Sequence, residues 1–369
     1  MTHDFAARLE QIEKSLNDAL SFHISSEWKK KSFGTLPAAI SDMHLLQLVE
    51  PCKQLIALGG KRWRPLLLVL CAESARSFYR ENALLSEEAT YTLAPLVEFV
   101  HTASLIHDDI EDCSDTRRGK PAAYITYGID SALNAASWLY FEACVCIDAL
   151  PIAAAAKAKF SALYTKELRR LHVGQAMDIF WHRNKSHIPS LEEYTAMVQH
   201  KTGTLASLAA QAGIIAGGGT DEEAAHAGDI AAEIGGGFQI LDDVQNLTTG
   251  NPGKKRGDDI VEGKKSLPVL LHISAHPEDR ERMAMLFSKA HDEGIDSPAV
   301  EECISLLAAS GAVAAAYEKG CKLVQEKSSA LASLYKTETA SAGISPIVKL
   351  FSAMMEKQKN AFTQEMCHA

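Results

Sequence analysis

The sequence has few aromatic residues and no long uninterrupted apolar segment. Phe, Trp and Tyr make up 7% of its 369 residues. The best apolar run, residues 66–72, is far shorter than the roughly 20 residues that a membrane-spanning helix needs. The first residues, MTHDFAARLEQIEK, are charged and amphipathic, without the apolar centre of a signal peptide. We therefore expect a cytoplasmic protein without stable membrane insertion.

Several chemical arrangements are also missing. The eight cysteines show no zinc-ligand spacing, since Cys144 and Cys146 are one residue apart in an apolar stretch, so reduced core thiols are expected. No Ser/His/Asp or Cys/His set suggests a side-chain nucleophile. The net charge of −10 argues against a nucleic-acid partner. It leaves a small polyanionic ligand open, because local basic clusters and metal ions decide that.

Long runs of alternating apolar and polar residues are absent, so no sheet is expected. Apolar residues instead recur three and four positions apart, which predicts helices. The predicted helices cover residues 5–20, 44–58, 65–79, 87–107, 131–148, 152–172, 192–216, 221–247, 267–274, 297–335 and 345–365. No Pro/Ser-rich linker divides the chain. The pattern predicts one all-α, bundle-like domain over residues 1–369, in which residues 275–369 serve packing.

Acidic residues gather in HDDIEDCSDTRRGK, residues 107–120, at the end of a strongly apolar stretch. Asp108 and Asp112 are four apart, which places them on one face of a helix where their charges repel. Mg²⁺ would relieve that repulsion, because it binds a few carboxylates and shares oxygens with a phosphate. Arg117 and Arg118 follow as natural phosphate ligands. The alternative is a solvated, charged helix end.

A second acidic group lies in GGGFQILDDVQN, residues 235–246. Asp242 and Asp243 end another apolar stretch, Asn246 takes the position four after Asp242, and Gln239 precedes Asp243 by one turn. Alone this group would also be surface. Two apolar helices that each end in such a group can instead face each other across a bundle and hold Mg²⁺ ions around one diphosphate.

Basic residues stand at three further places, each of which could also be an ordinary loop. GGKRWRP, residues 59–65, puts Lys61 and Arg64 at a helix start, where an anion is favoured. HKTGTL supplies Lys201 and Thr202. NPGKKRGDDIVEGKKSLP carries Lys254 and Lys264 in a charged loop that could close over phosphates.

GQAMDIFWHRN, residues 174–184, is interpreted mostly as packing. Gln175 and Asp178 are candidate supporting partners there.

Together these segments resemble the trans-prenyltransferases, the all-α isoprenyl diphosphate synthases. The resemblance covers about residues 55–272, with GGKRWRP, the double-arginine acid block, GQAMDI, HKTG, FQILDDVQN and EGKKSLPV in the family's order. It implies an isoprenoid-synthase bundle around a central cavity. It also implies a Mg²⁺-dependent enzyme, with up to three ions, that condenses isopentenyl diphosphate with an allylic diphosphate.

The resemblance assigns roles residue by residue. Metal ligands are expected at Asp108, Asp112, Asp242 and Asn246. Contacts to the allylic diphosphate are expected from Arg117, Lys201, Thr202, Gln239, Lys254 and Lys264. Contacts to isopentenyl diphosphate are expected from Lys61, Arg64, His101 and Arg118. Asn246 stands where many members of the family have Asp, and a subgroup that makes geranylgeranyl diphosphate carries the same Asn. Asp258 stands where many members have Lys, which leaves open how that loop closes.

Product length is expected to follow from residues along the substrate tail. Ala103 and Ser104, just before Asp108, are small, which predicts a product beyond fifteen carbons. Tyr140, Phe141 and His172 match the bulky floor of the geranylgeranyl-making subgroup and predict twenty carbons. The alternatives are a longer polyprenyl diphosphate, with these residues as core aromatics, or a non-catalytic subunit of a heteromeric synthase. A homodimer is expected from the resemblance alone.

Overall fold

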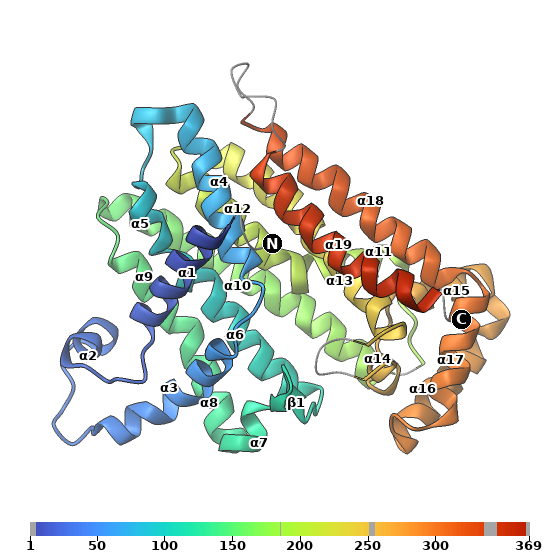
Figure 1. The fold of residues 1–369 in the computed structure, drawn as a ribbon. Coiled ribbons are helices and arrows are strands. Elements are labelled where there is room, and N and C mark those ends of the chain that lie inside the picture. Colours follow the sequence, from blue (N-terminus) through green and yellow to red (C-terminus); the bar gives the residue numbers. More distant parts are fainter. Residues whose placement is uncertain (1–4, 185, 251–254, 336–344, 367–369) are drawn as a thin grey trace. The chain divides into compact units, whose positions relative to one another are not determined.

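The computed structural model describes residues 5–184, 186–250, 255–335 and 345–366, with side chains as far as residue 359. These residues are helical almost throughout, which confirms the all-α prediction (Figure 1). Contacts divide the chain into two compact units. Unit 1 comprises Met1–Glu167, Ser207–Gly228 and Tyr335–Ser341, and unit 2 comprises Leu168–Ala206, Asp229–Leu334 and Ala342–Ala369. The single domain over residues 1–369 stays a prediction.

Unit 1 holds the N-terminal half of the chain. Its elements are α1 (Ala6–Ala19), α2 (Ser26–Phe33), α3 (Asp42–Ala57), α4 (Trp63–Tyr79), η1 (Arg80–Asn82), α5 (Glu87–Tyr91), α6 (Ala94–Glu111), β1 (Thr116–Arg117), β2 (Lys120–Pro121), α7 (Ala123–Tyr127), α8 (Ile129–Glu142) and α9 (Val145–Asp148). Three long helices contribute to both units, namely α10 (Ala154–Arg183), α12 (Thr204–Ala216) and α13 (Asp221–Leu247).

Helix α6 is the central element of unit 1 and carries the first acidic group at its end. It packs beside α8, which also packs against α3 (Figure 1). Pro95 stands in its first turn, where a missing N–H costs nothing. From Ala94 to Val100 every side chain is buried, and all of them except Glu98 are apolar, so this stretch forms a core helix. Burial of this stretch fixes where its polar end lies.

Helix α2 was not predicted, and an aromatic cluster holds it against α8. The Trp28 and Trp138 rings meet edge to face with centroids 6.3 Å apart, while Phe33 stacks on Trp138 at 6.2 Å. Ser25 caps the helix by accepting a hydrogen bond from the Trp28 N–H. Eight residues are too few for a stable isolated helix, so tertiary contacts decide its formation.

Unit 2 holds the C-terminal half of the chain. Its own elements are α11 (Leu191–Val198), the π-helix η2 (Gln199–Gly203), α14 (Asp258–Val261), α15 (Leu267–Ala275), η3 (Pro277–Asp279), α16 (Arg280–Glu293), α17 (Pro298–Ala309), α18 (Ala312–Ser333) and α19 (Pro346–Met366). Met283, Phe287, Cys303 and Leu307 are fully buried in its core. In Figure 1, α18 and α19 lie side by side.

Most predicted helices are present, but α16 was not predicted, and several boundaries differ. Helix α13 spans the predicted residues because Thr220 and Glu223 cap it reciprocally. The predicted helix 192–216 is interrupted by η2, and 297–335 is divided at Gly311, whose φ is +74°. Helix α10 continues past residue 172 to Arg183. Within the part of the chain that the structure describes, the expectation of no sheet is wrong only at the short β1–β2 hairpin.

Among the described residues, no single helix is long and apolar enough to span a membrane. Helices α17 and α18, bent by 67° at their junction, meet the length and composition criterion only as a pair.

Glu142 makes the stability of unit 1 depend on pH. Its side chain, the last of α8, is 5% exposed and accepts a hydrogen bond of 2.6 Å from the Ser32 hydroxyl. Burial raises the pKa of Glu142 to about 7. The folded state therefore holds this proton more tightly than the unfolded state, and its stability falls as pH rises from about 4.5 to about 7.

We expect Glu142→Gln to raise the free energy of unfolding above pH 7 by up to about 3 kcal/mol, because the amide removes the buried charge and can still accept from Ser32. Denaturant unfolding at pH 5 and pH 8 measures this. Glu27→Gln, an exposed change on α2, serves as the control. Equal loss of stability between pH 5 and pH 8 in Glu142→Gln and the wild type would contradict the expectation.

Candidate active site

The first acidic group lies at the C-terminal end of α6. The Asp112 N–H donates to the Asp108 carbonyl at 2.8 Å, so the two residues are one helical turn apart as predicted. The helix ends at Glu111, and Cys113 turns the chain with φ +53°. Asp108 and Asp112 are both half-buried. Their carboxylates therefore stand at the boundary between an apolar helix and its polar end.

Asp109 was not assigned a role from the sequence, and it anchors Arg117. Its side chain is 1% exposed, and its Oδ1 accepts hydrogen bonds from Arg117 Nε at 2.8 Å and from Arg117 Nη2. Arg117 Nη2 also lies 4.0 Å from Asp108 Oδ2. Although burial would lower the pKa of Arg117, the Asp109 carboxylate raises it overall. Arg117 is thus a fixed cation beside the predicted metal ligands.

A tight hairpin directs the side chain of the next arginine, Arg118, away from Asp109. Thr116 pairs with Pro121 and Arg117 with Lys120, which leaves Arg118 and Gly119 as a two-residue loop. Both loop residues have positive φ, +53° and +74°, as a type I′ turn requires. The Arg118 guanidinium donates to the Leu55 carbonyl at 3.2 Å and to the Gly59 carbonyl. Arg118 thereby joins the acidic group to the basic GGKRWRP segment within unit 1.

The basic segment surrounds His101 with cations. Arg64 Nη1 lies 3.4 Å from His101 Nε2, and because arginine only donates, Nε2 must be the acceptor. Burial, together with the charges of Arg64 and Arg118, lowers the pKa of His101 well below its usual value. His101 is therefore neutral. Lys61, the other residue predicted to contact isopentenyl diphosphate here, is exposed.

The residues predicted to set product length have different surroundings. Ala103 is fully buried, and the Ser104 hydroxyl donates to the His101 carbonyl at 2.8 Å. Tyr140 is 8% exposed and stacks on His107, with ring centroids 5.5 Å apart. Phe141 is 77% exposed. The two aromatic residues therefore do not form one buried pair in the single chain.

His172, the third residue of the predicted floor, belongs to unit 2 and is exposed. Its Nδ1 lies 2.9 Å from the Leu168 carbonyl, one turn earlier in α10.

In unit 2, the second acidic group ends α13. Asp242 is half-buried, and its Oδ1 accepts a hydrogen bond of 2.9 Å from Gln358 Nε2. Gln358 is 6% exposed and comes from α19, a helix expected to serve only packing. No motif signalled this contact, because it joins residues 116 positions apart.

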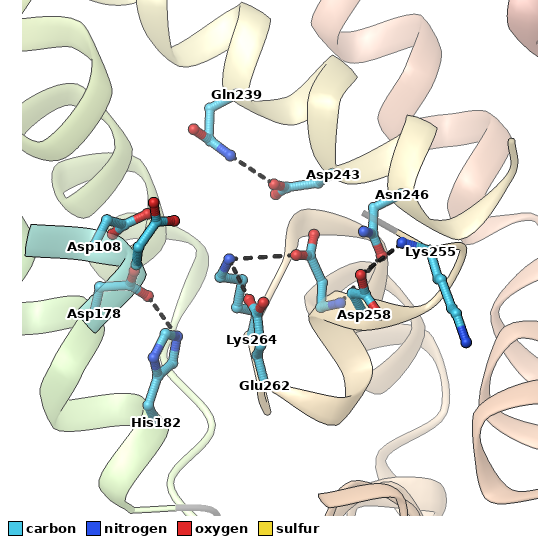
Figure 2. Close-up of polar contacts among 12 residues, drawn as sticks. Asp108, Asp178, His182, Gln239, Asp243, Asn246, Lys255, Asp258, Glu262 and Lys264 are labelled. Atoms are coloured by element: carbon cyan, nitrogen blue, oxygen red, sulfur yellow. Dashed lines mark hydrogen bonds and ion pairs between the residues drawn. The ribbon is translucent and has the colours of Figure 1, made fainter. Parts of the chain in front are cut away.

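A hydrogen-bonded chain fixes the side chains around Asp243, and Figure 2 shows its contact between Gln239 and Asp243. The Thr202 hydroxyl donates to Gln239 Oε1 at 2.7 Å, and Gln239 Nε2 donates to Asp243 Oδ1 at 2.9 Å. The Tyr194 hydroxyl donates to Asp243 Oδ2 at 2.9 Å. Burial, reinforced by the Asp259 carboxylate, raises the pKa of Asp243 to about 7. Thr202 and Gln239, predicted to contact the same diphosphate, are thus brought together.

Asn246, predicted as a metal ligand, is fully buried. Its Oδ1 accepts a hydrogen bond of 3.2 Å from the Asp259 N–H in α14, and its Nδ2 has no hydrogen-bond partner among the described residues. The Asn246 carbonyl also accepts from the Gly257 N–H at 3.0 Å. In this structure the Asn246 side chain therefore holds the loop that follows α13.

Lys201 is held by an acid from the GQAMDIFWHRN segment. Its Nζ lies 2.5 Å from Asp178 Oδ2. His182 Nε2 lies 3.1 Å from Asp178 Oδ1 (Figure 2). Burial alone would raise the pKa of Asp178, but Lys201 and His182 outweigh it and hold that pKa far below its usual value. The contact with Lys201 therefore supports the interpretation of Asp178 as a supporting partner.

The local backbone explains how Lys201 reaches Asp178. Lys201 lies in the π-helix η2, a single turn of the kind that often occurs at functional sites. A Cβ on Gly174 would lie 2.2 Å from the Lys201 nitrogen, so α10 and η2 approach too closely for any other residue. A Cβ on Gly203 would likewise lie 2.4 Å from the Ala232 carbonyl oxygen. These glycines set the distance between η2 and the two long helices.

The charged loop after α13 has its own ion pairs. Lys264 Nζ lies 2.5 Å from Glu262 Oε2 and 3.3 Å from Asp259 Oδ1 (Figure 2). Asp258, where relatives often have Lys, accepts a hydrogen bond of 2.6 Å from the Lys255 N–H at the start of α14. Lys254 lies outside the described residues.

Each unit thus combines carboxylates with fixed cations. Within the described ranges, no group of three or more His, Cys, Asp or Glu side chains is arranged to hold a metal ion. In unit 1, Asp108 and Asp112 offer only carboxylate oxygens. That donor set fits Mg²⁺, which binds one or two carboxylates and completes its coordination with water and phosphate oxygens.

Comparison with known proteins agrees with this fold and these motifs. Residues 46–306 match the family described as polyprenyl synthetase, and the chain belongs to that family. It is 34% identical to geranylgeranyl pyrophosphate synthase paxG of Penicillium paxilli over 59% of this chain, which covers 56% of that relative. It is 31% identical to geranylgeranyl pyrophosphate synthase dpmpD of Macrophomina phaseolina, over 82% of this chain and 88% of the relative.

Among solved structures, the chain resembles geranylgeranyl pyrophosphate synthetase from Pyrococcus horikoshii Ot3. The TM-score is 0.75 at 25% identity, and the match covers 96% of each chain. The fold is therefore that of the polyprenyl synthases.

Proposed function

We propose that this chain is a prenyltransferase that joins isopentenyl diphosphate head-to-tail, in trans, to an allylic diphosphate and makes geranylgeranyl diphosphate. The observation that carries the proposal is the acidic end of α6, where Asp108 and Asp112 stand beside Arg117, which Asp109 fixes in place. Membership of the polyprenyl synthetase family supports it, as do relatives named geranylgeranyl pyrophosphate synthases.

Asp108, Asp112 and Asp242 would hold Mg²⁺, with Asn246 as a weaker candidate. A Mg²⁺ ion held by these residues would supply positive charge to offset that of the departing diphosphate. Arg117, Lys201 and Lys264 hold the allylic diphosphate through charge-assisted hydrogen bonds, and each already has a fixed orientation from its carboxylate partner. Thr202 and Gln239 add neutral hydrogen-bonding groups beside Lys201.

The reaction needs positioned charge and no side-chain nucleophile. The allylic C–O bond breaks, and the electron pair leaves with the diphosphate, whose growing charge the cations stabilise. The isopentenyl double bond attacks the resulting carbocation to form the new C–C bond. Loss of a proton, taken up by the released diphosphate, restores a double bond. Lys61, Arg64, His101 and Arg118 are the groups that hold isopentenyl diphosphate for this attack.

A product assay tests the proposal. Purified protein is incubated with labelled isopentenyl diphosphate, Mg²⁺ and dimethylallyl, geranyl or farnesyl diphosphate in turn, and the dephosphorylated products are sized. We expect a dominant twenty-carbon alcohol and no product in EDTA. Asp108→Ala should lower turnover by about 100-fold or more, because charge on the leaving diphosphate loses a stabilising group.

The exposed change Asp18→Ala on α1 is the control and should retain wild-type turnover. Near-normal activity in Asp108→Ala would overturn the assignment. No condensation by the wild type with any primer would favour a non-catalytic subunit.

A longer product is the second candidate, because Phe141 is 77% exposed and leaves Tyr140 as the buried aromatic of the pair. We expect Tyr140→Ala to lengthen the main product by at least one five-carbon unit, because its ring fills buried space beside His107. Phe141→Ala should leave product length unchanged and is the matched control. Chromatography of the dephosphorylated alcohols decides, and a shift only in Phe141→Ala would show that the floor depends on Phe141.

We propose further that the protein is a homodimer. Ile129, Leu133 and Phe141 are 57%, 46% and 77% exposed and recur along one face of α8, an apolar stripe that a second copy would cover. Sedimentation should give twice the 40.0 kDa chain mass. Leu133→Asp should give the monomer, whereas Met285→Asp, a change at an exposed apolar residue of α16, should not. A monomeric wild type would reject the proposal.

A further inference from the structure

Arg62 is an arginine that the sequence motifs left without a role. Its side chain is 2% exposed and lies between two carboxylates from different helices. Arg62 Nη1 donates to Glu98 Oε1 of α6 at 2.6 Å, and Arg62 Nε donates to Glu13 Oε1 of α1 at 2.7 Å. Arg62 Nη2 donates to the Ile56 carbonyl at 2.6 Å. The guanidinium is therefore directed into the protein and away from solvent.

The backbone of Arg62 has an uncommon conformation. Its φ and ψ are +46° and +26°, in the left-handed region that side chains other than glycine seldom adopt. Such a conformation persists where surrounding contacts over-determine it. Here the contacts are those of the guanidinium with Glu13, Glu98 and Ile56. They hold the turn between Lys61, which is exposed, and Arg64, which faces His101.

The same segment is held from its other side. Arg118 donates to the Gly59 carbonyl, at the start of GGKRWRP, and to the Leu55 carbonyl at the end of α3. Lys61 and Arg64, on either side of Arg62, thus project from a backbone held at Gly59 and at Arg62. Glu98 is 3% exposed, so its carboxylate contacts no substrate from that position and acts through Arg62.

We propose that Glu98 and Glu13 are positioning residues that, through Arg62, fix Lys61 and Arg64 for the diphosphate of isopentenyl diphosphate. The inference rests on the proposed function and extends it from the residues that contact this substrate to those that hold them. Two simpler roles for these carboxylates predict results that differ from those of a positioning role. If Glu98 only balanced charge, its neutralisation would leave the site more positive and tighten anion binding. If Glu13 only docked α1, any break between α1 and α4 would act in the same way.

Glu98→Gln and Glu13→Gln separate these roles, because each keeps a hydrogen-bond acceptor but removes the charge. Glu73→Gln is the matched control. It removes the charge of Glu73 in α4, to which Arg8 of α1 donates at 2.7 and 2.9 Å, away from the basic segment. For each purified full-length protein, calorimetry gives the Kd of isopentenyl diphosphate, turnover gives KM for both substrates and kcat, and thermal unfolding reports the fold.

We expect Glu98→Gln to raise the Kd and KM of isopentenyl diphosphate about tenfold and Glu13→Gln about threefold, with KM for the allylic diphosphate within twofold of wild type. Glu73→Gln should leave all these constants within twofold. Tighter or unchanged binding in Glu98→Gln would overturn the inference, as would an equal change in Glu73→Gln. If Glu98→Gln does not fold, the half-exposed Glu13 decides through Glu13→Gln.

A wild type that binds isopentenyl diphosphate but forms no product with any primer rejects the proposed function, and the Kd values still decide the positioning role. A wild type that does not bind isopentenyl diphosphate rejects both.

Discussion

Ion pairs between fixed carboxylates and cations are the interactions on which the candidate site residues of each unit depend. Arg62 pairs with Glu98, Arg117 with Asp109, and Lys201 with Asp178. Each carboxylate is nearly buried. Arg117 and Lys201 would contact a diphosphate, and Arg62 would position the residues that do. A buried pair adds little net stability, but removal of one partner leaves an unpaired charge that costs about 3–5 kcal/mol. The main role of these pairs is therefore to fix the orientation of the cationic side chains.

The backbone serves the same purpose in unit 2. The π-helix η2 presents Lys201 and Thr202 on successive residues, and one binds Asp178 while the other binds Gln239. In a regular α-helix, Lys201 and Thr202 would be separated by the usual rotation of 100°. The π-helical turn departs from that geometry, and the contacts of the neighbouring glycines stabilise it. Close approach at Gly174 and Gly203 replaces side-chain packing with backbone contact. Precise placement of polar groups thus depends on residues that have no polar side chain.

Much of this arrangement could be predicted from the sequence, because apolar periodicity reports core helices directly. The boundaries of α13 and the one-turn separation of Asp108 and Asp112 followed from that periodicity. Contacts between distant residues could not be predicted in this way. Gln358 reaches Asp242 from another helix, and Glu13 reaches Arg62 across 49 positions. Neither Gln358 nor Glu13 belongs to a motif. Helix α2 depends on aromatic contacts with Trp138, which propensity in an eight-residue segment does not reveal.

The type I′ turn at Arg118 and Gly119 has a consequence for how this segment can change over evolutionary time. Two neighbouring arginines leave the hairpin in different directions, Arg117 to an acid on α6 and Arg118 to carbonyls near α3. A two-residue loop has no slack, and one added or deleted residue would exchange the faces of the paired strands. Substitutions at neighbouring exposed positions can accumulate here, whereas insertions and deletions cannot. Related sequences are therefore expected to keep the length of this segment more strictly than its composition.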